Sequence, residues 1–252
     1  MADSTDLFEY LLRLGDDRLV LGHRLSEWCG HGPILEEDIA TANIALDLVG
    51  QGTLFLKLAA DIQAAGRSAD DLAFFREAVE YRNLLLVELP KGDFGFTMLR
   101  EFLFDAFSVH LLEALQKSTN PDIAGIAAKA LKEARYHIRH TSQWVIRLGD
   151  GTEESHARVQ DSLNELWRFT GEMFQGDEVD ERLQVEGIAP DPATLHAPWK
   201  TVVDDVFARA GLAIPGNVFM TRGGRTGKHT EHLGHMLAEM QIVARSHPGA
   251  EW

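Results

Sequence analysis

Cysteine and positive charge are both scarce in this sequence of 252 residues. Because Cys29 is its only cysteine, the chain cannot form an internal disulfide, which weakly favours a reducing compartment. Lys and Arg number 24 against 39 Asp and Glu, which gives a formal net charge of −15. A nucleic-acid backbone is bound by a basic surface, so this imbalance argues against nucleic acid as a partner.

The sequence also lacks the segments that direct a protein to a membrane. Residues 1–12 are acidic and carry no basic stretch followed by an apolar one, so no export signal is expected. No apolar run approaches the roughly 20 residues that a membrane-spanning helix needs. We therefore predict a cytoplasmic protein without a membrane partner.

Strand-like alternation of apolar and polar residues is almost absent, whereas helical periodicity recurs throughout. We predict an all-α protein with a single domain over 1–252, because no linker long enough to separate two cores is present. The predicted architecture is a ferritin-like four-helix bundle core with additional N- and C-terminal helices. The core, over about 34–148, comprises helices expected at 34–65, 68–86, 96–117 and 121–148. The additional helices are expected at 6–28, 154–174, 199–210 and 229–246.

The connection between the second and third of these core helices, 87–95, is longer than a tight turn requires. At roughly 3.3 Å per extended residue, nine residues reach about 30 Å. That is the length of a 20-residue helix, enough to run along the bundle from end to end. A ferritin-like topology needs one such crossover, and we expect it here.

Polar side chains occur on core helices that are otherwise apolar. Asp105 lies on the third core helix, which is apolar on nearly every side and is therefore expected to be buried. Asn43, Asp47 and Gln51 are spaced four residues apart and form one polar stripe on the first. A buried carboxylate needs a cation, a hydrogen-bond donor or a raised pKa, so these positions draw attention as a site.

The second and fourth core helices offer similar groups. Glu80 and Asn83 lie on the second, and Glu133 and His137 on the fourth. Inward carboxylates and imidazoles on four helices hold two metal ions in carboxylate-bridged proteins. There, two helices supply one Glu each and the other two supply Glu-x-x-His.

The ligand pattern fails in detail on the fourth helix. A Glu-x-x-His ending at His137 requires Glu at the position of Ala134. Glu133 is one residue too early and is rotated by about 100° on a helix of 3.6 residues per turn. This helix therefore lacks one of the expected ligands.

The other helices depart from the pattern as well. Asn83 stands where histidine would follow Glu80, and Asp47 and Asp105 are each one methylene shorter than glutamate. We interpret the set as a vestigial metal site, now a network of hydrogen bonds and ion pairs, with no catalytic residue and no bound metal. The vestigial positions are Asp47, Glu80, Asn83, Asp105, Ala134 and His137.

Seven short segments, spread in order over nearly the whole chain, resemble one known family. It is the smaller, non-catalytic ferritin-like subunit of bacterial phenylacetyl-CoA epoxidase. The segments are Arg13–Asp16 (RLGD), Glu27–His31 (EWCGH), Ala42–Gln51 (ANIALDLVGQ), Asn83–Glu88 (NLLLVE), Lys132–His137 (KEARYH), Leu166–Phe169 (LWRF) and His229–Gly234 (HTEHLG).

The resemblance implies a role in a complex. The family's enzyme is an NADPH-dependent monooxygenase that epoxidises the ring of phenylacetyl-CoA during aerobic phenylacetate catabolism. A sister ferritin-like subunit holds the di-iron site and binds most of the substrate, and a reductase with FAD and an iron–sulfur cluster supplies electrons. By this resemblance the chain is a catalytically silent structural subunit with no cofactor of its own. Its expected partners are the catalytic and reductase subunits, and a homodimer is expected when it is expressed alone.

A basic, glycine-rich loop at 221–228 is open to several interpretations. Arg222, Arg225 and Lys228 are interleaved with glycines and could bind an anion, such as the phosphates of CoA. They could equally contact an acidic partner surface, or belong to a solvated loop. The sequence does not separate these alternatives.

Two other functions compete with the structural role. The chain could itself be an iron-carboxylate oxygenase with an atypical ligand set, namely Asp47, Glu80, Asp105, Glu133 and His137. A ferritin-like iron store is disfavoured, since the core lacks the density of ligands that storage requires. Whether the chain is itself an enzyme stays open at this point.

Overall fold

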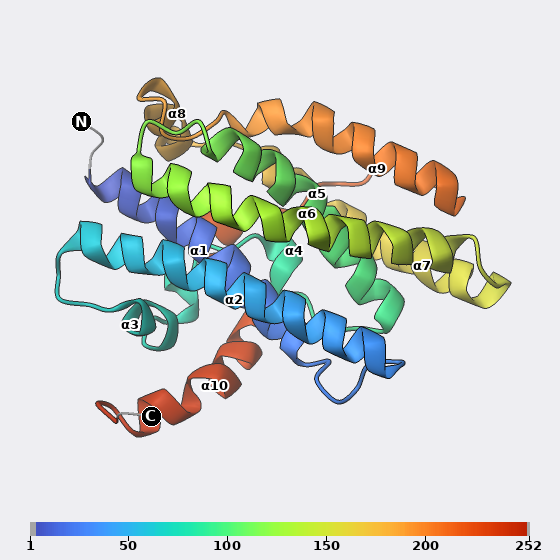
Figure 1. The fold of residues 1–252 in the computed structure, drawn as a ribbon, viewed down its shortest axis with the longest axis horizontal. Coiled ribbons are helices and arrows are strands. Elements are labelled where there is room, and N and C mark those ends of the chain that lie inside the picture. The colour runs from blue at the N-terminus through green and yellow to red at the C-terminus, as the bar shows by residue number, and fades with distance from the viewer. Residues whose placement is uncertain (1–3, 251–252) are drawn as a thin grey trace.

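The computed structural model describes residues 4–250, which fold into helices joined by loops (Figure 1). No strand occurs within that range, and the all-α prediction is confirmed. The α-helices are α1 (Ser4–Ser26), α2 (Leu35–Gln63), α3 (Ala69–Phe74), α4 (Leu85–Glu88), α5 (Phe94–Leu115), α6 (Pro121–Gly149), α7 (Glu153–Leu166), α8 (Glu178–Val185), α9 (His196–Ala210) and α10 (Glu231–Ser246). The 3-10 helices are η1 (Ala78–Glu80), η2 (Trp167–Phe169), η3 (Gly171–Phe174), η4 (Pro192–Leu195) and η5 (Gly224–Thr226).

The bundle core consists of α1, α2, α5 and α6. Extensive contacts join α1 to α2 and α5 to α6, so the core is two helical hairpins packed together (Figure 1). Contacts between the hairpins include Arg18 with Ser108, from α1 to α5, and Asp47 with His137, from α2 to α6. Such an arrangement of two hairpins is the connectivity expected of a ferritin-like bundle.

A long crossover, residues 64–93, joins the two hairpins. Both α2 and α5 run antiparallel to α1, as the residue pairings across each interface show. They are therefore parallel to each other, and the chain must return along the bundle between them. The crossover is present, but the predicted location at 87–95 is wrong, because that segment is only the last part of it.

The predicted core helix over 68–86 is also wrong. Short helices α3, η1 and α4 occupy this range instead. The reason lies in α1, where two buried carboxylates accept hydrogen bonds from this backbone. Asp16 accepts from the N–H of Arg82 at 2.8 Å, and Asp17 accepts from the N–H of Leu84 at 2.7 Å. These donors would bond to carbonyls four residues earlier in a continuous helix.

Consequently α1, expected to be an additional helix, is the fourth helix of the bundle. Small residues bring it close to α2: a Cβ built on Gly52 would lie 3.1 Å from the carbonyl oxygen of Gly15 and 3.2 Å from the amide nitrogen of Leu19. A side chain at Gly52 would therefore meet α1 backbone, which cannot move aside like a flexible side chain.

The remaining helices cover the bundle. The expected helix over 154–174 ends as α7 at Leu166 and continues as η2 and η3. The helix α6 begins at Pro121 and is capped by Asn120, whose side chain accepts from the backbone N–H groups of Asp122 and Ile123. In Figure 1, α9 lies along α6, and α10 projects from the opposite side of the molecule, where it contacts α3 and η1.

Candidate functional site in the core of the bundle

A buried arginine occupies the centre of the bundle. Arg18 of α1 is fully buried, and its Nε donates to Oε1 of Gln51 on α2 at 3.1 Å. Gln51 in turn donates from Nε2 to Oε2 of Glu133 on α6 at 2.9 Å. The guanidinium also lies 5.0 Å from the ring centroid of Phe55. Burial lowers the pKa of Arg18 to about 10, so it stays a cation at neutral pH.

A further contact between α2 and α6, the hydrogen bond between His137 and Asp47, lies at the edge of the core. Nε2 of His137 lies 3.0 Å from Oδ2 of Asp47. The histidine side chain is 1% exposed, whereas the aspartate side chain is 38% exposed. Asp47 is therefore a partly solvated residue rather than a buried carboxylate.

Two carboxyl groups one turn apart lie deep in α5. Asp105 accepts from Oγ1 of Thr141 at 2.9 Å, while both carboxyl oxygens of Glu101 lack a hydrogen-bond partner among the described residues. Burial raises the pKa of Glu101 to about 8, only partly offset by the charge of Arg100. Burial and the charge of Glu101 raise the pKa of Asp105 well above its ordinary value. Glu101 therefore holds its proton at neutral pH, and burial disfavours the charged form of Asp105 as well.

Sequence reasoning missed Glu101. The signal that could have found it is its position four residues before Asp105 on the same apolar helix, which places both on one face.

The predicted vestigial positions do not all come together. Asp105, Ala134 and His137 are buried on α5 and α6, with Asp47 at the rim. Glu80 instead lies exposed in η1 and accepts from the backbone N–H of Glu77, and Asn83 is buried in the crossover. The expected inward placement of Glu80 and Asn83 is therefore corrected, because the helix over 68–86 that would have carried them into the bundle core does not form.

The residues present do not fit a dinuclear carboxylate centre. Within residues 4–250, no group of three or more His, Cys, Asp or Glu side chains is placed to hold a metal ion. The set proposed for an oxygenase also loses Glu80, and an arginine lies between α1 and α2 where a ligand would be needed.

A separate polar cluster clamps the crossover and the C-terminal loop to α1. The guanidinium of Arg225 donates to both carboxylate oxygens of Asp17, at 2.9 and 2.8 Å, and to the carbonyl of Arg82 at 2.7 Å. Asp17 is fully buried. The sequence left Arg225 open as an anion contact, a partner contact or part of a solvated loop; in the structure its guanidinium is paired with Asp17 of the same chain.

The other two cations of that loop remain at the surface. Arg222 and Lys228 are exposed and line a cavity of about 340 Å³ beside Glu172. Glu172 itself accepts from the backbone N–H groups of Gly223 and Gly224, both at 2.8 Å. Its carboxylate thus shapes the loop, and only the two exposed cations are available to a ligand.

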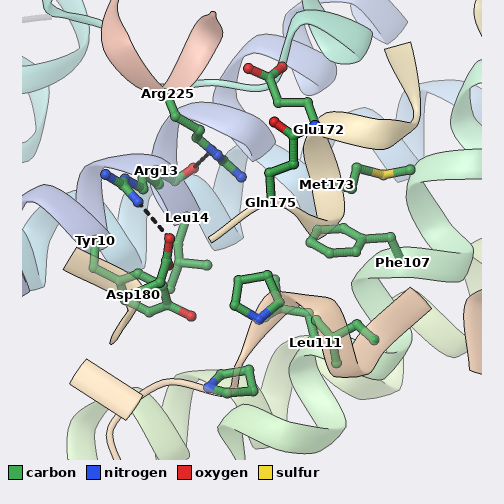
Figure 2. Close-up of a pocket in the computed structure, with 13 residues that line it drawn as sticks. Tyr10, Arg13, Leu14, Phe107, Leu111, Glu172, Met173, Gln175, Asp180 and Arg225 are labelled. Carbon is green, nitrogen blue, oxygen red and sulfur yellow. Dashed lines mark hydrogen bonds and ion pairs between the residues drawn. The ribbon is translucent and has the colours of Figure 1, made fainter. Parts of the chain in front are cut away.

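The neighbouring inner cavity is small. Figure 2 shows it enclosed by Tyr10, Phe107 and Met173, with Arg13 paired to Asp180 at 3.0 Å on one side. Its volume is about 30 Å³, room for about two water molecules. A substrate does not fit there without movement of the surrounding side chains.

A comparison of the chain with known families agrees with the resemblance found in the seven short segments. Residues 1–252 match the family described as phenylacetic acid catabolic protein. The chain belongs to this family. One member, a subunit of the 1,2-phenylacetyl-CoA epoxidase of Escherichia coli (strain K12), is 50% identical over 246 residues. The match covers 98% of this chain and 99% of that protein, so the similarity extends over nearly the full length of both.

Proposed function

We propose that the chain is a catalytically silent, structural subunit of a phenylacetyl-CoA epoxidase complex in phenylacetate catabolism. The observation that carries this proposal is the content of its bundle core. Arg18 and Gln51 connect α1, α2 and α6, while Asp105 is bonded to Thr141 and the buried Glu101, whose pKa is raised to about 8, has no cation among the described residues beside its oxygens. The relative's name, as a subunit of a phenylacetyl-CoA epoxidase, supports membership of such a complex.

In the proposed complex, the chemistry belongs to other subunits. A ferritin-like catalytic subunit would hold two irons and most of the phenylacetyl-CoA, and a reductase carrying FAD and an iron–sulfur cluster would bring electrons from NADPH. This chain would stabilise the catalytic subunit by packing against it. We further propose that the complex assembles in the cytoplasm and that the isolated chain forms a homodimer.

Reconstitution from purified components tests the proposal. NADPH-dependent consumption of phenylacetyl-CoA is measured with the catalytic subunit and reductase, with and without this chain. Activity should be lost or decay rapidly when the chain is omitted, and an equal mass of an unrelated protein should not restore it. Full and stable activity without the chain would contradict the proposal.

A further inference from the structure

The helix α2 is far more apolar than its burial within the chain requires. By length and composition alone it could cross a membrane, yet only 44% of its most apolar 18-residue window is buried. Its inner side packs on α1, through residues such as Phe55 and Leu56. Its outer side carries Leu35, Ile39 and Leu46, which are 71%, 52% and 70% exposed.

These exposed residues form one continuous stripe. Leu35, Ile39, Asn43, Leu46 and Gly50 follow each other at spacings of three or four residues and are all exposed. This spacing keeps side chains on one side of a helix, as at a helix–helix interface. At Gly50 no atom lies within 4 Å of a built Cβ, so the surface there is open and allows close approach of another helix.

Beside this stripe, α6 presents a row of cations. In Figure 1, α2 and α6 run side by side in the layer nearest the viewer, with α1 and α5 behind them. The exposed side of α6 carries Lys129, Lys132 and Arg139, none of which has a carboxylate partner among the described residues. Such a concentration of positive charge is unusual in a chain whose net charge is −15.

The two helices form one surface, because side chains from both meet at their boundary. Nε1 of Trp144 donates to Oε2 of Glu37 on α2 at 2.7 Å. The ring of His140 lies within 3.2 Å of the same carboxylate and stacks on Tyr136, which is 42% exposed. An exposed aromatic ring thus continues the apolar stripe across to the cations.

We infer that the exposed sides of α2 and α6 form the docking face for a separate helical subunit, which presents apolar side chains bordered by carboxylates. This inference rests on the proposed function and adds to it the surface and the chemistry of the contact. Apolar side chains at the centre and complementary charges at the edge are the usual anatomy of a specific interface.

Charge favours a different subunit over a second copy of this chain. In a two-fold pairing that packs α2 antiparallel on its copy, each α6 faces the other α6. The cation rows of the two copies would then repel. A partner with carboxylates opposite Lys132 and Arg139 would instead gain favourable contacts and faster association.

Binding between this chain and the catalytic subunit, both purified, measures the effect. Leu46→Glu should weaken the complex by about 30-fold or more, as expected for a central interface residue. Val185→Glu is the matched control, since Val185 is 88% exposed on α8 and outside the docking face. This control should bind like the wild type.

A second pair of variants tests the charges. The double variant Lys132→Glu, Arg139→Glu should slow association and reduce its dependence on salt, whereas Lys228→Glu on the C-terminal loop should not. Circular dichroism melting of each variant alone separates loss of binding from loss of folding.

The outcomes distinguish this inference from the proposed function. If the wild-type chains bind and Leu46→Glu binds equally well, the docking face is wrong while the structural role stands. If the wild-type chains do not bind at all, the proposed function fails. Two further results overturn the inference. In the first, Leu46→Glu abolishes self-association of the chain but leaves its binding to the catalytic subunit unchanged. In the second, the wild-type chain binds phosphatidylglycerol vesicles through this face.

Discussion

Replacing Glu101 by glutamine should stabilise the protein, although it removes a charged residue type from the core. The folded-state pKa of Glu101 is about 8 against an ordinary value of 4.5. At pH 7 the carboxyl is ionised in the unfolded chain, and its ionisation stabilises that state in proportion to the difference between pH 7 and the ordinary pKa, about 2.5 units. In the folded protein the carboxyl stays mostly protonated and lacks this stabilisation. At 1.36 kcal/mol per unit, this amounts to about 3 kcal/mol, which the variant recovers.

The pH dependence gives the sharper test. Because the folded pKa is raised, the folded protein binds more protons than the unfolded chain between pH 4.5 and 8. Stability of the wild type therefore falls with rising pH through this window, by about 1.4 kcal/mol per pH unit from this group. The Glu101→Gln variant lacks this loss, so its advantage should be small near pH 4.5 and largest at pH 8.

Urea unfolding of both proteins at pH 5.5, 7 and 8 measures the difference. The amide of glutamine has nearly the shape of a protonated carboxyl and is neutral at every pH, with two N–H donors where the carboxyl has one O–H, so the exchange removes the titration and adds one buried donor. Glu165→Gln, at an exposed position on α7, is the matched control and should show no such gain. A Glu101→Gln protein that is less stable than the wild type at pH 7, or an advantage independent of pH, would refute the reasoning.

Three further predictions concern packing and the polar clamp. Gly52→Val should cost about 1–3 kcal/mol or more in unfolding free energy, because the new side chain meets α1 backbone; an unchanged thermal midpoint would contradict the close approach. Arg225→Ala should cost about 3–5 kcal/mol by leaving Asp17 buried and unpaired, and a urea midpoint like that of the wild type would show the pair to be dispensable. Burial lowers the pKa of His229, but the hydrogen bond and charge of Glu88, at 2.7 Å, outweigh this and raise it. The stability that the His229–Glu88 pair contributes is complete below the ordinary histidine pKa of 6.5 and is lost as pH rises through the raised pKa of His229. Amide hydrogen exchange of α10, corrected for intrinsic rates, should therefore accelerate as pH rises through that pKa. Protection of α10 that does not depend on pH would contradict this prediction.

Much of the architecture was predictable from local patterns. The helices at α2, α5, α6, α9 and α10 follow from apolar periodicity and from breaks at glycine and proline. A long crossover was also expected, because the ferritin-like topology requires one, although the sequence placed it at 87–95. These features depend on residues close in sequence, which is why the sequence reveals them.

The choice of bundle helices was not predictable in the same way. Residues 68–86 have helical periodicity, but Asp16 and Asp17 capture their backbone donors from a distance of more than 60 residues. Arg76 adds to this by pairing with Asp16. Such long-range contacts override local propensity, and they moved Glu80 out of the predicted site.

The candidate site was partly predictable for the same reason. Asp105 and His137 are buried as their apolar helices suggest. The role of Arg18 was missed, because an arginine side chain normally lies in water. Only the packing of α1 against α2 brings it to Gln51.

The central claim is that this chain builds the complex and leaves the metal chemistry to its partner. Iron analysis of the chain purified alone from cells grown with ample iron tests it most directly, alongside the complex with the catalytic subunit. The account predicts far less than one iron per chain in isolation, with the iron of the complex accompanying the catalytic subunit when the two are separated. A full dinuclear complement on this chain alone, with the absorption of a carboxylate-bridged centre, would contradict it.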